Sequence, residues 1–160
     1  MRARPFILVA AIVSLFALPH VGSAGVRDDR PNLVGGEVGG RGLLFTLNYE
    51  RFLSNHFGLG AGLMAIKAGG GGVTVVPLYA SFVPGNTHSP YLSVGTTLLA
   101  GGGDFQDWES TWLVQFSFGY QYHSSGGFFV RPFFTYLRPT ESGSGDDYLV
   151  WPGLTIGGSF

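Results

Sequence analysis

One spacing in this sequence could support hydrolysis: His123 is followed two positions later by Ser125. In such a pair the serine hydroxyl attacks an ester, the histidine takes its proton, and a carboxylate orients the histidine. Glu141 is the candidate carboxylate. However, Ser125 falls in a tight turn predicted at residues 124–126, and the strand order derived below puts Glu141 at the opposite end of the molecule. We therefore expect no catalytic residues.

Metal and phosphate binding can be considered in the same way. His56, His88 and His123 each lie at or beside a short predicted turn. A metal site needs three or four such ligands to converge, and three separate turns do not favour that, so we expect exposed histidines and no metal. The glycines at 69–72 lack the Lys and the Ser or Thr that follow in a phosphate-binding loop. We expect no cofactor.

Four polar side chains fall on the less apolar face of predicted strands and form a candidate interior cluster of structural character: Glu50, Arg131, Gln115 and Gln121. Arg131 must point inward if the other face contacts lipid, because an arginine at the bilayer midplane costs roughly 2–4 kcal/mol. Glu50 and Arg131 are expected near the same end of the molecule. They could form a buried ion pair or remain separately hydrated, and neither arrangement implies catalysis.

Segments of alternating apolar and polar residues must position these side chains, and such alternation is typical of strands with one apolar face. The pattern predicts strands at residues 32–38, 42–50, 57–65, 73–83, 91–100, 111–123, 128–136 and 148–160. Glycine (27 of 160 residues) disfavours helices, and aromatic residues (15 %) favour strands. We predict an all-β protein, an eight-stranded antiparallel up-and-down transmembrane β-barrel. Side chains just fill the interior of a barrel of this size, so no wide pore is expected.

The N-terminal region predicts export. Arg2 and Arg4 precede a nearly uninterrupted apolar run from Phe6 to Leu18, and small residues follow at 22–24, which is the pattern of a cleaved signal peptide. The run is shorter than the roughly 20 residues that a transmembrane helix requires. We predict a signal peptide at 1–24, an N-terminal extension at 25–31 and the barrel at 32–160. The net charge of −1 gives no support to nucleic-acid binding.

The lengths of the connections predict an orientation in the membrane. Short connections at 51–56, 84–90 and 124–126 alternate with longer or glycine-rich ones at 67–72, 101–110 and 138–147. Bacterial barrels have short periplasmic turns and longer outer loops. The last strand is therefore expected to run towards the periplasm and to leave Phe160 on that side.

The sequence resembles a family of small bacterial outer-membrane β-barrel domain proteins. The resemblance rests on Asn48-Tyr49-Glu50-Arg51, on short motifs in the same order along the chain, and on the terminal Phe160. The further motifs are Gly58-Leu59, Val76-Pro77-Leu78, Gly119-Tyr120-Gln121-Tyr122, Gly126-Gly127-Phe128-Phe129 and Trp151-Pro152-Gly153-Leu154. Ser159 departs from the family, where Arg is frequent at that position. The resemblance implies an eight-stranded barrel, largely without an assigned activity, in which Phe160 is part of the signal read by the barrel-assembly machinery.

These observations favour a Gram-negative outer-membrane protein with a structural or surface-interaction role and no enzymatic activity. The expected partners are outer-membrane lipid, lipopolysaccharide and, during insertion, the barrel-assembly machinery; the expected state is a monomer. Two alternatives remain. One is an exported soluble, lipocalin-like barrel that binds a hydrophobic ligand, for which an interior with Glu50 and Arg131 is unsuitable. The other is a lipid A deacylase-like hydrolase, which requires His123, Ser125 and a carboxylate to meet.

Overall fold

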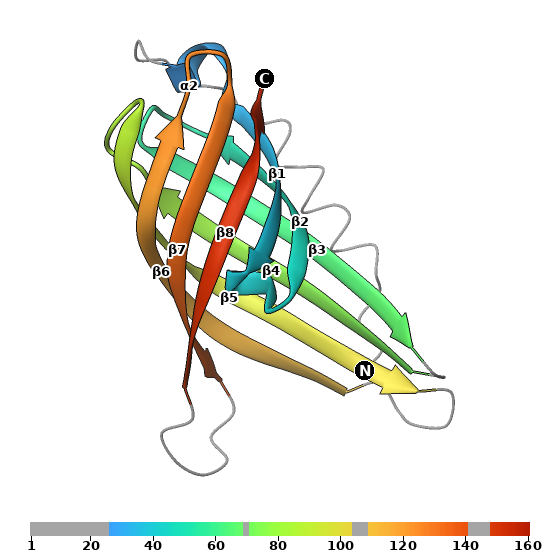
Figure 1. Ribbon diagram of the computed structural model, residues 1–160. Coiled ribbons are helices and arrows are strands. Elements are labelled where there is room, and N and C mark those ends of the chain that lie inside the picture. Colours follow the sequence, from blue (N-terminus) through green and yellow to red (C-terminus); the bar gives the residue numbers. More distant parts are fainter. Residues whose placement is uncertain (1–25, 69–70, 104–108, 141–147) are drawn as a thin grey trace.

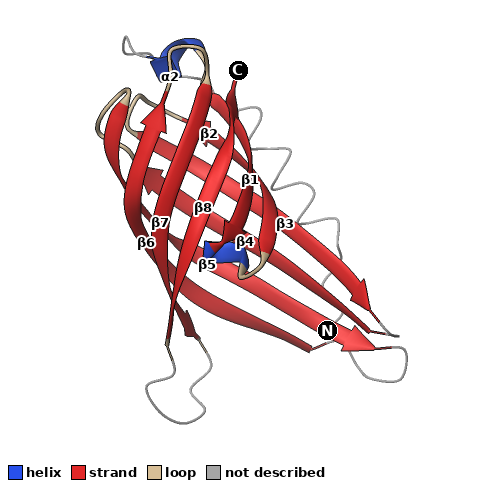
Figure 2. Ribbon diagram, in the orientation of Figure 1, coloured by secondary structure: helices blue, strands red, loops and turns tan. Residues whose placement is uncertain are grey.

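The protein is a closed β-barrel of eight antiparallel strands. The computed structural model describes residues 26–68, 71–103, 109–140 and 148–160. Each strand pairs with its neighbours in chain order, and β1 pairs with β8 to close the barrel (Figure 1; Figure 2). The strands are β1 (Asn32–Gly39), β2 (Phe45–Phe52), β3 (Phe57–Ala68), β4 (Gly71–Phe82), β5 (His88–Gly103), β6 (Glu109–His123), β7 (Phe128–Pro139) and β8 (Leu149–Ser159). The predicted fold class is confirmed.

The two faces of each strand differ in exposure, as the alternating sequence requires. In β6, Phe116 and Phe118 are exposed on the outside, whereas Gln115 and Ser117 are completely buried in the interior. The outer surface is therefore apolar and the interior is largely polar. This inversion suits a barrel that contacts lipid rather than water.

The barrel closes where the first and last strands meet. Leu33 pairs with Ser159 and Val38 with Leu154. Beyond the strand ends, the Asn32 amide donates to the Phe160 carbonyl at 3.1 Å, and the Phe160 amide donates to the Asn32 carbonyl at 2.9 Å. The ladder between β1 and β8 thus continues to the last residue.

Among the residues that the structure describes, two short helical segments accompany the strands. Helix α2 (Val26–Asp29) lies at the end of the barrel that also carries the C-terminus (Figure 1). The 3₁₀ turn η1 (Gly40–Gly42) joins β1 to β2. Within the described residues, no helix has the length and the hydrophobicity needed to cross a membrane.

The connection between β1 and β2 turns into the interior of the barrel. Gly39 and Gly40 have φ angles of 71° and 61°, a region in which glycine has no steric penalty. A Cβ on Gly40 would press against the Phe133 ring. The fold brings Arg41 inside, where it is completely buried. Because these residues turn inward, β2 begins at Phe45 and not at residue 42 as predicted.

Other strand ends also differ from the predictions. β5 begins at His88, so the connection after β4 ends before His88 and does not extend to Pro90; β5 also runs on to Gly103. The ladder continues through pairs such as Ser89 with Gln121 and Gly101 with Glu109. Backbone hydrogen bonds do not require apolar side chains, so pairing extends beyond the segments in which alternation is visible.

Candidate functional site

Of the residues considered for hydrolysis, the structure describes His123 and Ser125, and these two are not hydrogen-bonded to each other. The His123 Nε2 atom lies 2.8 Å from the Ser159 hydroxyl, which in turn donates to the Gly127 carbonyl at 3.1 Å. Within the described residues, the other ring nitrogen of His123 has no hydrogen-bond partner. The structure therefore pairs His123 with Ser159 and not with Ser125, and Glu141 lies outside the described residues.

The other histidines are dispersed. His56 lies in the turn between β2 and β3 and is exposed, and His88 contacts the Tyr120 hydroxyl on the outer side of the barrel. The described part of the chain contains no group of three or more His, Cys, Asp or Glu side chains placed to hold a metal ion. The interior of the barrel is thus the main concentration of polar chemistry that the structure describes.

Three of the four residues predicted for the interior cluster lie together. Arg131, on β7, donates from Nη1 to Glu50 on β2 at 2.7 Å, and from Nε and Nη2 to the Gln121 carbonyl oxygen at 2.9 and 2.6 Å. The Ser81 hydroxyl on β4 donates to the other Glu50 oxygen. Each charge is therefore neutralised and hydrogen-bonded, which a buried ion pair requires.

A second ion pair lies nearer the β1–β2 connection. Arg41 contacts Glu37 through its backbone amide (2.9 Å), through Nε (3.1 Å) and through Nη2. Asn48 and Thr155 also donate to Glu37, at 3.0 and 3.3 Å. The 3₁₀ turn holds this pair in place, because it places Arg41 four residues after Glu37 and folds it back over that carboxylate.

Two aromatic rings pack against the guanidinium groups. The Arg41 Cζ atom lies 3.8 Å from the centre of the Tyr79 ring, and the Arg131 Cζ atom lies 4.1 Å from the centre of the Tyr91 ring. Such cation–π contacts strengthen when they are removed from water. Tyr79 fits because β3 carries Gly60 opposite it, where a Cβ would overlap the tyrosine ring.

Tyr91 connects the two ion pairs. Its hydroxyl accepts a 2.8 Å hydrogen bond from Arg41 Nη1, while its ring packs on Arg131. Gln115, the fourth predicted residue, lies apart from Glu50: its amide donates to the Leu78 carbonyl at 3.1 Å, and its oxygen accepts from Thr97 at 3.2 Å. The two ion pairs and Tyr91 thus form one polar network. Gln115 is also buried but is not hydrogen-bonded to either ion pair.

The N-terminal extension contacts two of the connections at one end of the barrel through Arg27. Arg27, in α2, is completely buried and donates to the backbone carbonyls of Asn55 (2.8 Å), Val83 (3.2 Å) and Gly85 (2.8 Å). Its guanidinium also lies 4.8 Å from the centre of the Phe52 ring. Burial lowers the pKa of Arg27 to about 10, a shift that the charge of Glu50 opposes, so the group remains a cation at neutral pH.

Sequence reasoning did not identify Glu37, Arg41 or Arg27 as interior residues. Glu37 carried a signal, since it occupies the same strand face as Leu33, which is also buried. Arg41 and Arg27 lie outside the strands, where alternation gives no information. The structure alone shows that both enter the barrel.

No family model matches the sequence, and no curated protein matches it. Among solved structures, the barrel is similar to the N-terminal β-barrel domain of Pseudomonas aeruginosa OprF, with a TM-score of 0.58 and 15 % identity over 80 % of this chain and 98 % of that domain. The attachment invasion locus protein Ail of Yersinia pestis gives a TM-score of 0.42 at 15 % identity, over 80 % of this chain and 92 % of Ail. Both are outer-membrane β-barrels, and at this identity the likeness to OprF shows the fold alone.

Proposed function

We propose that this protein is a small outer-membrane β-barrel with a closed interior, which serves a structural or surface-interaction role without catalysis. The observation that carries this proposal is the filled interior. Two buried ion pairs are joined there through Tyr91. Arg27 adds a further buried cation at the end of the barrel that carries α2. A solute would have to displace these paired charges. Any activity is therefore exerted by the outer surface and the loops.

The outward apolar surface supports the membrane location. Exposed outward residues include Leu47, Leu63, Val94, Phe118 and Phe134 on five different strands. A water-soluble monomer rarely exposes so large a continuous apolar surface, whereas a barrel in lipid requires it. The outer-membrane lipid, the lipopolysaccharide and the barrel-assembly machinery are accordingly the partners that we propose, and the monomer is the proposed state.

The two alternatives have less support. A lipocalin-like barrel would bind its hydrophobic ligand inside, where this protein has Glu37, Glu50 and two arginines. A hydrolase would require His123 to face Ser125, whereas it faces Ser159.

Cell fractionation and conductance measurements test the proposal together. We expect the protein in the outer-membrane fraction, with a shift in gel mobility on boiling, and no stable large conductance steps when the purified barrel is inserted into planar bilayers. Recovery in the soluble periplasm without a mobility shift would contradict the membrane location. Frequent large openings of the unmodified protein would contradict the closed interior.

A further inference from the structure

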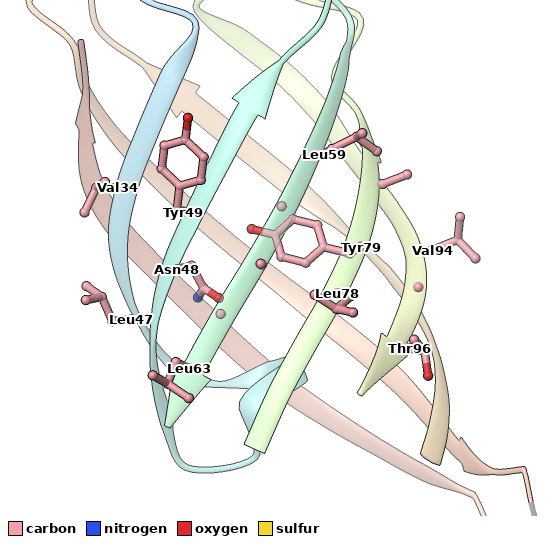
Figure 3. A pocket seen from close by; sticks show the side chains of 15 residues that line it. Val34, Leu47, Asn48, Tyr49, Leu59, Leu63, Leu78, Tyr79, Val94 and Thr96 are labelled. Atoms are coloured by element: carbon pink, nitrogen blue, oxygen red, sulfur yellow. The ribbon is translucent and has the colours of Figure 1, made fainter. Parts of the chain in front are cut away.

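The outer surface of the barrel carries a groove across β2, β3, β4 and β5. Its volume is about 610 Å³, and its lining is almost entirely apolar. Figure 3 shows Leu47, Leu63 and Leu78 among the side chains around it. The groove exists because β3 and β4 carry small outward residues there, Ala61 and Ala80, between larger neighbours.

A second depression of about 560 Å³ continues this groove. It shares Leu47 and Leu63 with the first and reaches Gly36 and Ile156 on β1 and β8. Pairing between β2 and β3 stops at Leu47 with Leu63, although β3 runs on to Ala68. The two strands separate there, and the depression lies at this separation.

The opposite side of the barrel differs in side-chain size. β6 and β7 present large outward rings, among them Phe116, Phe118 and Phe134, and Phe118 stacks on Phe134 with ring centres 5.9 Å apart. Bulky rings fill that surface, whereas small residues leave the β2–β5 surface hollow. A flexible apolar chain can therefore bind in the hollow of the β2–β5 surface, whereas the aromatic surface has no comparable groove for it.

A positive charge lies one outward position beyond Ala65, which is the last residue of β3 that lines the second depression. Lys67 is exposed and occupies the same outward face of β3 as Leu63 and Ala65, two outward positions beyond Leu63. Four residues of strand place it about 13 Å from Leu63 along the chain. Lys67 lies at the end of the barrel opposite to Phe160. The loop lengths predict that the end with Lys67 is the outer side. An apolar groove with a cation a short distance beyond it on the same strand face matches the acyl chain and the phosphate of an anionic lipid.

We propose that the β2–β5 groove, together with Lys67, is a specific binding site for one anionic phospholipid-type molecule of the surrounding membrane. One acyl chain occupies the groove over Ala61 and Ala80, and the lipid phosphate is bound by Lys67. The inference rests on the proposed outer-membrane location, and it adds a selective lipid site that this location does not require.

Native mass spectrometry of the purified, refolded chain tests the site. The probes are dimyristoylphosphatidylglycerol and dimyristoylphosphatidylcholine, which share their acyl chains and differ in net charge. We expect the phosphatidylglycerol to be retained about fivefold more strongly, the factor expected for one basic residue at an anionic surface. Lys67→Gln removes this preference, and Ala61→Phe, which fills the groove, lowers retention of both lipids.

Matched variants on the aromatic surface serve as controls. Arg138→Gln removes an exposed outward cation of β7 at the end of the barrel that also carries Lys67. Val130→Phe enlarges an outward residue of β7. Both should retain the preference of the unmodified protein. Equal losses in Lys67→Gln and Arg138→Gln, or in Ala61→Phe and Val130→Phe, would overturn the site.

Other outcomes separate the alternatives. Displacement of the lipid by inorganic phosphate would show a simple anion site, and a dimer abolished by Ala61→Phe would show that a second copy fills the groove; either result overturns the proposal. Heat-shifted mobility reports folding of each variant. A chain that folds but shows no lipid preference contradicts this inference alone, whereas a chain that does not fold into lipid contradicts the proposed function.

Discussion

The hydroxyl of Tyr91 accepts a 2.8 Å hydrogen bond from Arg41, so a residue of β5 reaches the 3₁₀ turn between β1 and β2. The ring of Tyr91 meanwhile packs on Arg131 of β7. Through this one side chain, the Glu37–Arg41 pair and the Glu50–Arg131 pair become parts of a single network. The inward turn is thereby attached to the far wall of the barrel.

The first prediction concerns this hydrogen bond. Tyr91→Phe removes the hydroxyl and keeps the ring, so Arg41 loses one buried partner. We expect the free energy of unfolding to fall by about 1.5–3 kcal/mol, the range for hydrogen bonds to charged groups. Urea unfolding in detergent micelles measures it. Tyr136→Phe, on the outer surface, is the control and should change stability little. If Tyr91→Phe changes stability as little as Tyr136→Phe does, Tyr91 acts only through its ring.

The second prediction concerns Glu50 and Arg131. Arg131→Met leaves a buried carboxylate without its cation, and Glu50→Gln leaves the cation without its carboxylate; each should cost about 3–5 kcal/mol. The double variant contains neither charge and should be less destabilised than the sum of the single variants. A double-mutant cycle by urea unfolding measures this coupling. Additive losses would mean that the two side chains contribute independently.

The strands and the closed architecture could be predicted from the sequence because alternation has a period of two and the interior is polar. Glu50, Gln121 and Arg131 could be assigned to the interior for the same reason: each occupies the face opposite exposed apolar residues. The contact between Glu50 and Arg131 could not be derived, because it joins residues 81 positions apart and depends on strand register.

The interior positions of Arg41 and Arg27 could not be predicted from the sequence. Both lie in short segments outside the strands, and whether such a segment turns outward or inward depends on tertiary contacts. For Arg41 the deciding features are two glycines with positive φ and the carboxylate of Glu37. For Arg27 they are three backbone carbonyls, which the sequence does not identify.

The third prediction uses two glycines of the barrel wall. At Gly60 a Cβ would overlap the Tyr79 ring, which packs on Arg41, whereas at Gly36 no atom lies within 4 Å of the added Cβ. Gly60→Ala should therefore destabilise the barrel by about 1–3 kcal/mol, as overpacking does. Gly36→Ala should leave stability unchanged or slightly raised. Thermal unfolding of the two variants in the same micelles tests this difference, and similar unfolding temperatures would contradict it.

The fourth prediction concerns Arg27 at the end of the barrel. Arg27→Ala removes the donor to the Asn55, Val83 and Gly85 carbonyls, so α2 loses these three hydrogen bonds to the barrel. We expect brief, small conductance openings in planar bilayers that the unmodified protein lacks, together with faster proteolysis of the N-terminal extension. Arg30→Ala, three residues later and partly exposed, is the matched control. Identical traces for all three proteins would show that Arg27 does not restrict the interior.

The fifth prediction separates two roles of Phe160. Its backbone pairs with Asn32, and the residue as a whole is 61 % exposed. Phe160→Ala keeps the backbone bonds, so refolding into micelles and the unfolding temperature should change little, as for other surface substitutions. If the ring is part of the signal read by the barrel-assembly machinery, the heat-shifted form in cell outer membranes should nevertheless decrease several-fold.

Phe128→Ala is the control for Phe160, because Phe128 is also an exposed outward ring near the same end of the barrel and pairs with Gly158. It should lower lipid contact by a similar amount without impairing insertion in cells. Equal defects of the two variants in cells would mean that lipid contact, and not recognition, accounts for the effect. A refolding defect of Phe160→Ala in micelles would place its role in the folded barrel itself, since no assembly machinery is present there.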